Sequence, residues 1–254
     1  MLDEILQLNI FHFFLVFSRI GTAMMLLPGI GGQLVGVRSR LWLTFAICFV
    51  VLPVLSPHLP ATPTTPGAVL AIVFSETVVG LFMGVVVALL MSTLTLAGSM
   101  IGYQTGLTNA FSFDPISQQQ SQLLTGFLSN VGMLAVFSTD LHHLMLTALV
   151  ESYGVFQPGH GVAFGEMAES LSHVLTDTFR LGLQFAMPLL VFGLVFYAGL
   201  GVLSRLAPML QVFFIAMPIQ VLMGMWMFMV TLPVIISLFL RFFEGGLIPY
   251  LTPR

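Results

Sequence analysis

The chain alternates between long apolar stretches and shorter polar segments. Most of the apolar stretches are long enough to cross the hydrocarbon core of a bilayer as a helix, which takes roughly 20 residues at about 1.5 Å of rise each. Membrane β-strands would instead alternate in polarity over about ten residues, and no such pattern stands out. The sequence therefore predicts an all-α, polytopic membrane protein. The six apolar stretches cover about residues 10–28, 41–55, 69–101, 123–150, 181–203 and 206–240.

Two of these stretches are too long for one straight crossing. Residues 206–240 would form a helix of about 50 Å, against a hydrocarbon thickness near 30 Å. Pro218, Gly224 and Pro233 offer breaking points, so we expect a helical hairpin within this stretch. Residues 69–101 pose the same problem, and we expect them either to fold back or to stand partly outside the bilayer against other proteins.

Two polar segments separate apolar stretches in the middle of the chain. Residues 102–122 form an insertion between the third and fourth stretches. Residues 151–179 form the longest hydrophilic segment, and its later part, residues 165–177, predicts a short amphipathic helix. Neither segment is long enough for a separate soluble domain.

The composition agrees with a membrane protein and narrows its function. The chain has ten acidic and seven basic residues, 17 of 254 in all, whereas soluble domains spend roughly a quarter of their residues on charge. The net charge is −3 and there is no polybasic run, so nucleic acid is not an expected partner. Cys48 is the only cysteine, which excludes an internal disulfide and disfavours a cysteine-based metal site.

Small residues recur at intervals of four along the third apolar stretch. Such spacing places them on one helix face and lets another backbone approach closely. The pattern predicts helix packing, either within the chain or against another subunit. The residues are Gly80, Gly84, Ala88 and, after a shift in phase, Gly98 and Gly102.

Three charged residues lie in or beside apolar stretches, where an unpaired charge is expensive. Glu76 near the start of the third stretch is either an ion or proton site or, as we favour, the structural partner of an arginine such as Arg19 or Arg205. Arg19 has the same two interpretations, because a buried guanidinium needs a partner or a route to the interface.

Asp140, His142 and His143 cluster in the fourth apolar stretch. Adjacent helical side chains point about 100° apart, so we expect the two histidines not to bind one metal ion together. A polar patch at a helix end or a protein interface is the favoured interpretation, with no metal site. The sequence has no HExxH motif, no G-x-S-x-G nucleophile elbow and no phosphate-binding G-x-x-x-x-G-K loop, so an enzyme is not expected.

The segment GLTNAFSFDP, residues 106–115, joins a helix-packing glycine to two aromatic residues and an Asp-Pro turn. Such a loop could block an opening, or it could be a connection that packs against the protein. The candidate gate residues are Gly106, Leu107, Phe111, Phe113, Asp114 and Pro115.

Several separated motifs resemble the FliR family of flagellar biosynthetic proteins and the matching inner-membrane subunits of virulence type III secretion systems. The resemblance covers nearly the whole chain. It rests on Arg19 followed by LLPGIGG, on ETVVGLFMG, LAGSMIGYQTGLTNAFSFDP, the histidine at 142, ESYGVFQPG and GLGVLSRLAPMLQVFFIAMP. The chain departs from the family at Asp140, where an Asn-Gly-His sequence is frequent, and at Gln211, where asparagine is frequent.

The resemblance implies a non-enzymatic subunit of the flagellar export gate, without a cofactor. It implies kinked helices and helical hairpins in one export-gate domain over 1–254, FliP-like over about 1–180 and FliQ-like over about 181–254. The implied partners are FliP- and FliQ-like subunits in a helical pore complex, FlhA- and FlhB-like components, unfolded flagellar proteins and membrane lipid. The implied location is the bacterial inner membrane within the flagellar basal body, with the loop at 106–115 as a plug.

Two other functions remain open from the residues alone. An ion-coupled secondary transporter would use Glu76 and Asp140, and it predicts an inverted repeat, which is not evident here. An intramembrane hydrolase would use His142 or His143 and would lose activity on a single histidine substitution.

Overall fold

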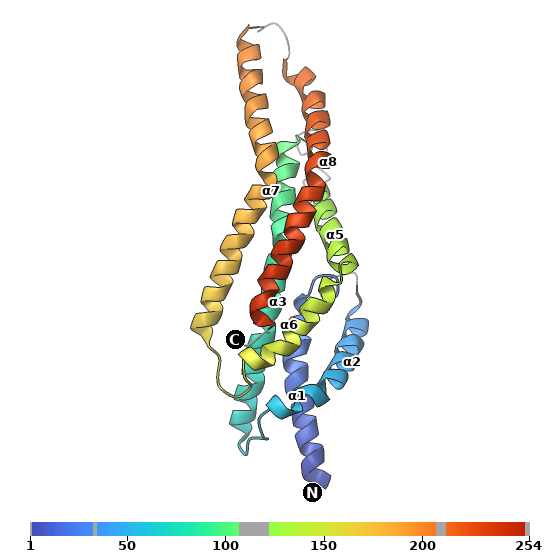
Figure 1. Cartoon of the computed structure of the whole chain (residues 1–254), viewed down its shortest axis with the longest axis vertical. Helices are drawn as coiled ribbons and strands as arrows, with labels where there is room; N and C mark the ends of the chain where they lie inside the picture. The colour runs from blue at the N-terminus through green and yellow to red at the C-terminus, as the bar shows by residue number, and fades with distance from the viewer. Residues whose placement is uncertain (1, 33–34, 107–121, 207–211, 252–254) are drawn as a thin grey trace. The chain divides into compact units, whose positions relative to one another are not determined.

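The computed structural model describes residues 2–32, 35–106, 122–206 and 212–251, and every regular element within these ranges is helical (Figure 1). This agrees with the all-α prediction. The α-helices are α1 (Leu2–Leu26), α2 (Val37–Leu55), α3 (Pro66–Gln104), α5 (Gln122–Ser138), α6 (Leu141–Val155), α7 (Phe164–Leu206) and α8 (Val212–Leu247). Two short 3-10 helices are η1 (Ser56–His58) and η2 (Ile248–Tyr250).

The chain folds into two compact units, and three long helices contribute to both. The first unit comprises Met1–Leu90, Val136–Val174 and Phe243–Arg254. The second comprises Met91–Ala135 and Leu175–Phe242.

In the first unit, α1 lies at the centre of the packing. Val16, Ile20 and Met24 are spaced by four residues and are fully buried, so one face of α1 is enclosed over this part of the helix. Helix α2 packs against another face of α1, where the rings of Phe13 and Phe45 lie 4.8 Å apart between centroids. The core of this unit is therefore built around α1.

In the second unit, α3 is approached closely by three other helices. A Cβ atom at Gly98 would lie 2.7 Å from the Cα atom of Thr125 in α5, and one at Gly182 in α7 would lie 2.8 Å from a methyl carbon of Leu96. A Cβ atom at Gly224 in α8 would lie 3.1 Å from Thr105. The contact at Gly98 is with backbone and leaves no room for a larger side chain, and the other two are tight. Helices α7 and α8 run antiparallel within this unit, as a helical hairpin (Figure 1).

The expected hairpin within residues 206–240 is wrong, because α8 continues without a break through Pro218 and Pro233. A proline removes one backbone hydrogen bond, but an apolar helix has no water to satisfy further broken bonds, so the loss does not end the helix. Helix α3 is likewise continuous over 39 residues, so residues 69–101 do not fold back.

Two other boundaries also differ from the sequence-based expectation. The apolar stretch 123–150 is broken into α5 and α6, which meet at an angle of 75°. Asp140 stands at the break with a φ of 59°, a left-handed conformation that interrupts a right-handed helix. The short helix expected at 165–177 is instead the beginning of the 43-residue helix α7.

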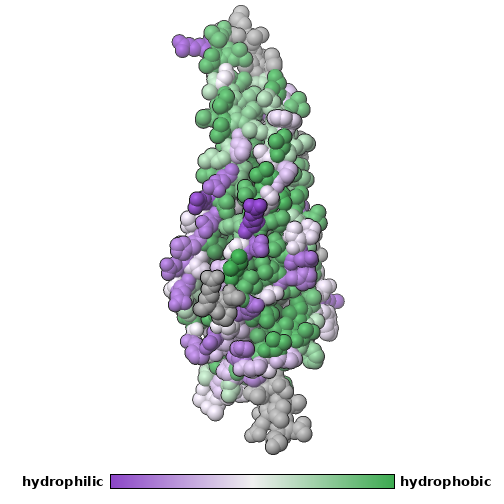
Figure 2. All heavy atoms as spheres, in the orientation of Figure 1, coloured by the Kyte–Doolittle hydropathy of each residue, from purple (hydrophilic) through white to green (hydrophobic). Residues whose placement is uncertain are grey.

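Among the residues that the structure describes, four helices are long and apolar enough to cross a membrane, and the bent α5–α6 pair is a fifth candidate if it makes one span. Apolar side chains occupy much of the surface seen in Figure 2. Trp226 and Leu194 in the second unit are exposed over 68% and 74% of their surface. This exposure is what lipid-facing or partner-facing helices require.

Candidate functional site

A buried ion pair joins α1 to α3 in the first unit. Arg19 Nε donates to Glu76 Oε2 at 2.7 Å, and Arg19 Nη2 donates to Glu76 Oε1 at 3.0 Å. Arg19 is fully enclosed and Glu76 is 1% exposed. This two-point geometry satisfies both carboxylate oxygens, which a buried charge pair needs.

The remaining surface of the guanidinium contacts α6 and the turn that follows it. Nη1 donates to Ser152 Oγ at 3.3 Å, and Nη2 also donates to the carbonyl oxygen of Phe156 at 2.8 Å. The ring of Tyr153 covers the guanidinium, with Cζ 3.9 Å from the ring centroid. We call the cluster of Arg19, Glu76, Ser152, Tyr153 and Phe156 the Arg19 junction. It connects three helices of the first unit through one side chain.

Of the two arginines considered as partners for Glu76, the structure pairs it with Arg19. Arg205 lies in the second unit, exposed in the last turn of α7. There a cation is favourably placed at the negative end of the helix dipole.

The first two small residues of α3 lie against α1. A Cβ atom at Gly80 would collide with Thr22 Oγ1 and with the carbonyl oxygen of Arg19. One at Gly84 would lie 2.8 Å from Leu26 Cβ. In the same unit, Ala88 is half-buried. Gly80 and Gly84 thus allow the backbones of α1 and α3 to approach each other beside the Arg19 junction.

The later small residues of α3 belong to the second unit. Gly98 is the point of contact with α5 described above. Gly102 is buried and its carbonyl oxygen accepts a hydrogen bond from Thr105 Oγ1 at 3.1 Å. Gly106 ends the described part of this segment with a φ of 73°, which glycine adopts without strain.

Gln220 of α8 packs beside Gly106, at the base of the predicted plug. Its Nε2 donates to the carbonyl oxygen of Gln104 at 3.1 Å and to Tyr197 Oη at 2.9 Å. A Cβ atom at Gly106 would lie 3.0 Å from that nitrogen. The amide of Gln220 therefore connects α3, α7 and α8 where the segment begins. The other plug candidates, Leu107, Phe111, Phe113, Asp114 and Pro115, lie outside the described residues.

Asp140, His142 and His143 are brought together at the start of α6. Their potential ligand atoms all lie within 4.8 Å of one another, and the two imidazole centroids are 4.1 Å apart. The expected divergence of the two rings is therefore wrong. The ring of His142 also stacks on that of Phe137, with the centroids 4.9 Å apart. Asp140 and His143 are exposed, and the positive end of the α6 dipole opposes a bound cation, so we do not assign a metal site.

The sequence did not single out the uncharged residues of the Arg19 junction or of the hydrogen-bonded group around Gln220. Ser152 and Tyr153 were not distinguished from other residues of their stretch. Gln220 did offer a signal, because it is an uncharged polar residue in a long apolar stretch, where its amide needs partners. Tyr197 offered none, because a single tyrosine near a membrane interface is common.

The chain is similar to known proteins over most of its length. Residues 10–246 match the family described as bacterial export proteins, family 1. The flagellar biosynthetic protein FliR of Caulobacter vibrioides is 36% identical over 211 residues, which cover 83% of this chain and 84% of that protein. FliR of Aquifex aeolicus is 30% identical over 221 residues, covering 87% and 85%. The secretion system apparatus protein SsaT of Salmonella typhimurium is 23% identical over 167 residues, covering 65% and 64%.

The family match spans both units, and two FliR proteins align over more than four-fifths of the chain. The Arg19 junction and the small-residue face of α3 both fall within the matched range. The chain therefore belongs to the family of bacterial export proteins that contains the flagellar biosynthetic protein FliR.

Proposed function

We propose that this chain, a structural subunit of the flagellar type III export apparatus, forms part of a closed channel through which unfolded flagellar proteins leave the cytoplasm. The partners that we propose are FliP- and FliQ-like subunits, with FlhA- and FlhB-like components beside them. We place the complex in the bacterial inner membrane, within the flagellar basal body. The chain itself performs no proposed reaction, and its role is mechanical.

The observation that carries this proposal is the amount of apolar surface on the α7–α8 hairpin. The apolar residues 181–206 of α7 and 212–240 of α8 would extend about 39 and 44 Å, against a hydrocarbon thickness near 30 Å. Large apolar side chains are exposed on both helices, including Val202, Leu206 and Trp226. Lipid alone cannot cover helices of this length in an upright position. Protein partners supply the missing apolar surface.

The proposed division into a FliP-like part, about 1–180, and a FliQ-like part, about 181–254, is supported by the same hairpin. Two antiparallel apolar helices are the simplest unit that a small membrane subunit could resemble. The proposal predicts that residues 181–254 contact neighbours of a different kind from those that residues 1–180 contact.

Residues 106–115 are proposed to close the channel at rest. Support comes from the base of this segment, where Gly106 turns the chain and Gln220 holds the end of α3. For the channel to open, the neutral hydrogen bonds of Gln220 must break when a substrate enters, and each contributes only about 1 kcal/mol. Phe111 and Phe113 would supply the apolar seal.

The test replaces residues 106–115 with a shorter Gly/Ser linker in the assembled complex. We expect cells to leak ions or small solutes, because the proposed seal is removed. The same linker in place of residues 61–65, in the connection between η1 and α3, is the control and should leave permeability unchanged. Unchanged permeability of the first variant in an intact complex would refute the plug.

The partners are tested by purifying a tagged chain from its own cells. We expect two smaller apolar membrane proteins to accompany it, and export of flagellar subunits to stop when the chain is deleted. Recovery of the chain alone, with export intact after deletion, would refute the proposed assembly.

The ion-coupled transporter is not supported. Both oxygens of Glu76 are bound by Arg19, and Asp140 is an exposed residue at the break between α5 and α6. Because both of its oxygens are already hydrogen-bonded to a buried guanidinium, the carboxylate is poorly placed to bind a transported ion.

A further inference from the structure

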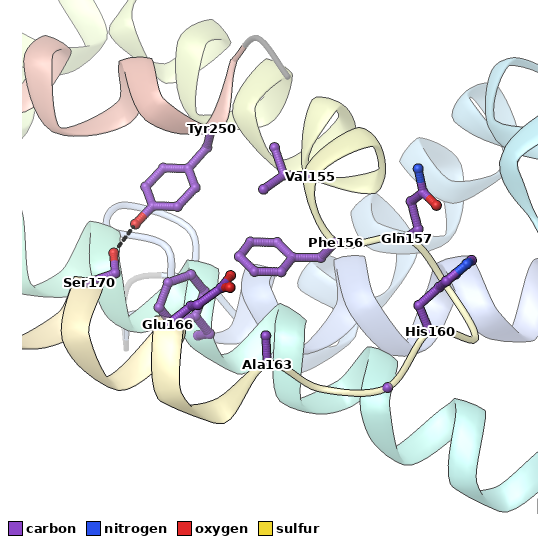
Figure 3. A pocket seen from close by; sticks show the side chains of 10 residues that line it. Val155, Phe156, Gln157, His160, Ala163, Glu166, Ser170 and Tyr250 are labelled. Carbon is purple, nitrogen blue, oxygen red and sulfur yellow. Dashed lines mark hydrogen bonds between the residues drawn. The ribbon is translucent and has the colours of Figure 1, made fainter. Parts of the chain in front are cut away.

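The first unit contains a pocket of about 430 Å³ where α6 ends, α7 begins and η2 follows α8 (Figure 3). Three aromatic rings lie at this pocket. The Phe82 ring meets those of Phe156 and Tyr250 edge to face, with centroids 5.6 and 5.9 Å apart. Tyr250 is held in place by a hydrogen bond of 2.7 Å between its hydroxyl and that of Ser170. The rings therefore form a fixed aromatic wall.

The pocket also carries a carboxylate. Figure 3 shows Glu166 of α7 extending into the same space as the ring of Phe156. No arginine or lysine lines this pocket, and among the described residues no ion pair involves Glu166. Aromatic faces beside a free carboxylate favour an organic cation, because the ring quadrupole and the negative charge attract it together.

The first turn of α7 offers a complementary site for an anion. The amides of Gly165 and Glu166 lie in that turn, where helix geometry provides no acceptor. Gln157, at the same pocket, adds an amide donor. Such donors favour a phosphate group. The pocket thus presents an anion-binding end next to a cation-binding end.

An almost wholly apolar groove of about 230 Å³ adjoins the pocket and shares Phe82 with it. Val78, Leu81 and Val85 of α3 form one side, and Leu171 of α7 is on the other. The groove lies between α3 and the first two turns of α7, and the pocket lies beside it, where η2 follows α8. An apolar groove of this kind suits a hydrocarbon chain.

From the polar pocket and the adjoining apolar groove we infer a binding site for a phospholipid whose headgroup ends in a primary ammonium group, as in phosphatidylethanolamine. The ammonium group contacts Glu166 and the aromatic wall, and the phosphate faces the first turn of α7. One acyl chain occupies the groove. A lysine of a partner protein would satisfy Glu166 equally well, but it would leave the groove empty, so the lipid accounts for more of the structure.

The experiment uses the purified full-length chain in detergent and native mass spectrometry. Phosphatidylethanolamine and phosphatidylglycerol with identical acyl chains are added in equal amounts. We expect the wild-type chain to retain phosphatidylethanolamine about fivefold better, because only this headgroup offers a cation to the carboxylate and the rings. Phosphatidylcholine should be intermediate, since its methylated ammonium keeps the ring contact and cannot donate to Glu166.

Three variants localise the effect. Glu166→Gln should reduce the preference about fivefold, to near unity, and Phe156→Leu should reduce it to a lesser extent. Glu169→Gln removes the same charge from the same helix, outside the pocket lining, and should leave the preference unchanged. Glu166 is exposed, so its substitution tests binding without loss of the fold.

Three outcomes would overturn the lipid site. The first is equal retention of the two lipids by the wild-type chain. The second is an equal loss of preference in Glu166→Gln and Glu169→Gln, which would indicate general surface charge. The third is a zero-length carbodiimide cross-link between Glu166 and a lysine of another subunit in the assembled complex, together with no lipid preference there. That result would assign the pocket to a partner protein.

Discussion

Replacing Glu76 by glutamine is expected to destabilise the first unit strongly. The amide keeps the shape of the side chain and one acceptor, but it leaves the charge of Arg19 without a counter-charge inside the protein. Breaking a buried ion pair by removing one partner costs about 3–5 kcal/mol in soluble proteins. Arg19 keeps its contacts with Ser152 and with the carbonyl of Phe156, so we expect the lower value, about 3 kcal/mol.

A series of variants distinguishes the contribution of the ion pair to stability from that of the other contacts in the Arg19 junction. Ser152→Ala removes a single neutral acceptor at 3.3 Å and should cost about 1 kcal/mol. The double variant Arg19→Leu/Glu76→Leu should lose less than the sum of its single variants, because it leaves no uncompensated charge. Glu169→Gln, at an exposed position, is the control and should be neutral.

The free energy of unfolding is measured by titration of the full-length chain from mild detergent into sodium dodecyl sulfate. A Trp226→Phe background leaves Trp42 of α2 as the only tryptophan, so its fluorescence reports on the first unit. If Glu76→Gln proves no more destabilising than Ser152→Ala, the ion pair does not stabilise the fold. A variant that folds normally but loses export would instead indicate that Glu76 acts in transport.

Further predictions concern helix contacts and the base of the proposed plug. Gly80→Ala should destabilise the chain by about 1–3 kcal/mol in the same titration, because the added methyl group meets α1; Gly67→Ala, in open space on the same helix, should be neutral or slightly stabilising. Gly106→Ala should cost about 1 kcal/mol, because its φ of 73° is unfavourable for alanine, and should raise ion leakage of the assembled complex. Gln220→Leu should raise the same leakage, since it removes the hydrogen bonds at that base; leakage unchanged in both variants would contradict this role.

Much of the helical architecture could be predicted from the sequence, because the period and length of an apolar stretch are local properties. Helix α3 follows closely from the apolar stretch at 69–101. The hairpin expected within 206–240 is wrong because it rests on the length of the stretch and on Pro218, Gly224 and Pro233 as breaking points, and neither determines whether a helix ends. In the folded chain, α8 contacts α3 at Gly224 and α5 at Phe228, and the helix continues through both prolines despite the loss of two backbone hydrogen bonds.

Only part of the candidate site could be predicted from the sequence. A charge in an apolar stretch signals that a partner exists, and this identified both Arg19 and Glu76. The choice between Arg19 and Arg205 depends on a contact across 57 positions of sequence, which no local pattern determines. The turn at Asp140 was missed because a left-handed aspartate has no distinct sequence signature within TDLHH.

The kinds of contact in the two units indicate where movement during export should begin. In the first unit, the Arg19 junction combines a two-point ion pair with a carbonyl acceptor and an aromatic face around a fully enclosed guanidinium. At the end of α3 in the second unit, Gln220 contributes neutral hydrogen bonds of about 1 kcal/mol each. Breaking the contacts of the Arg19 junction would leave a charge without a partner inside the protein. Breaking the hydrogen bonds of Gln220 exposes polar groups that water or a passing polypeptide can satisfy. We therefore expect the base of residues 106–115 to yield before the helices that meet at Arg19.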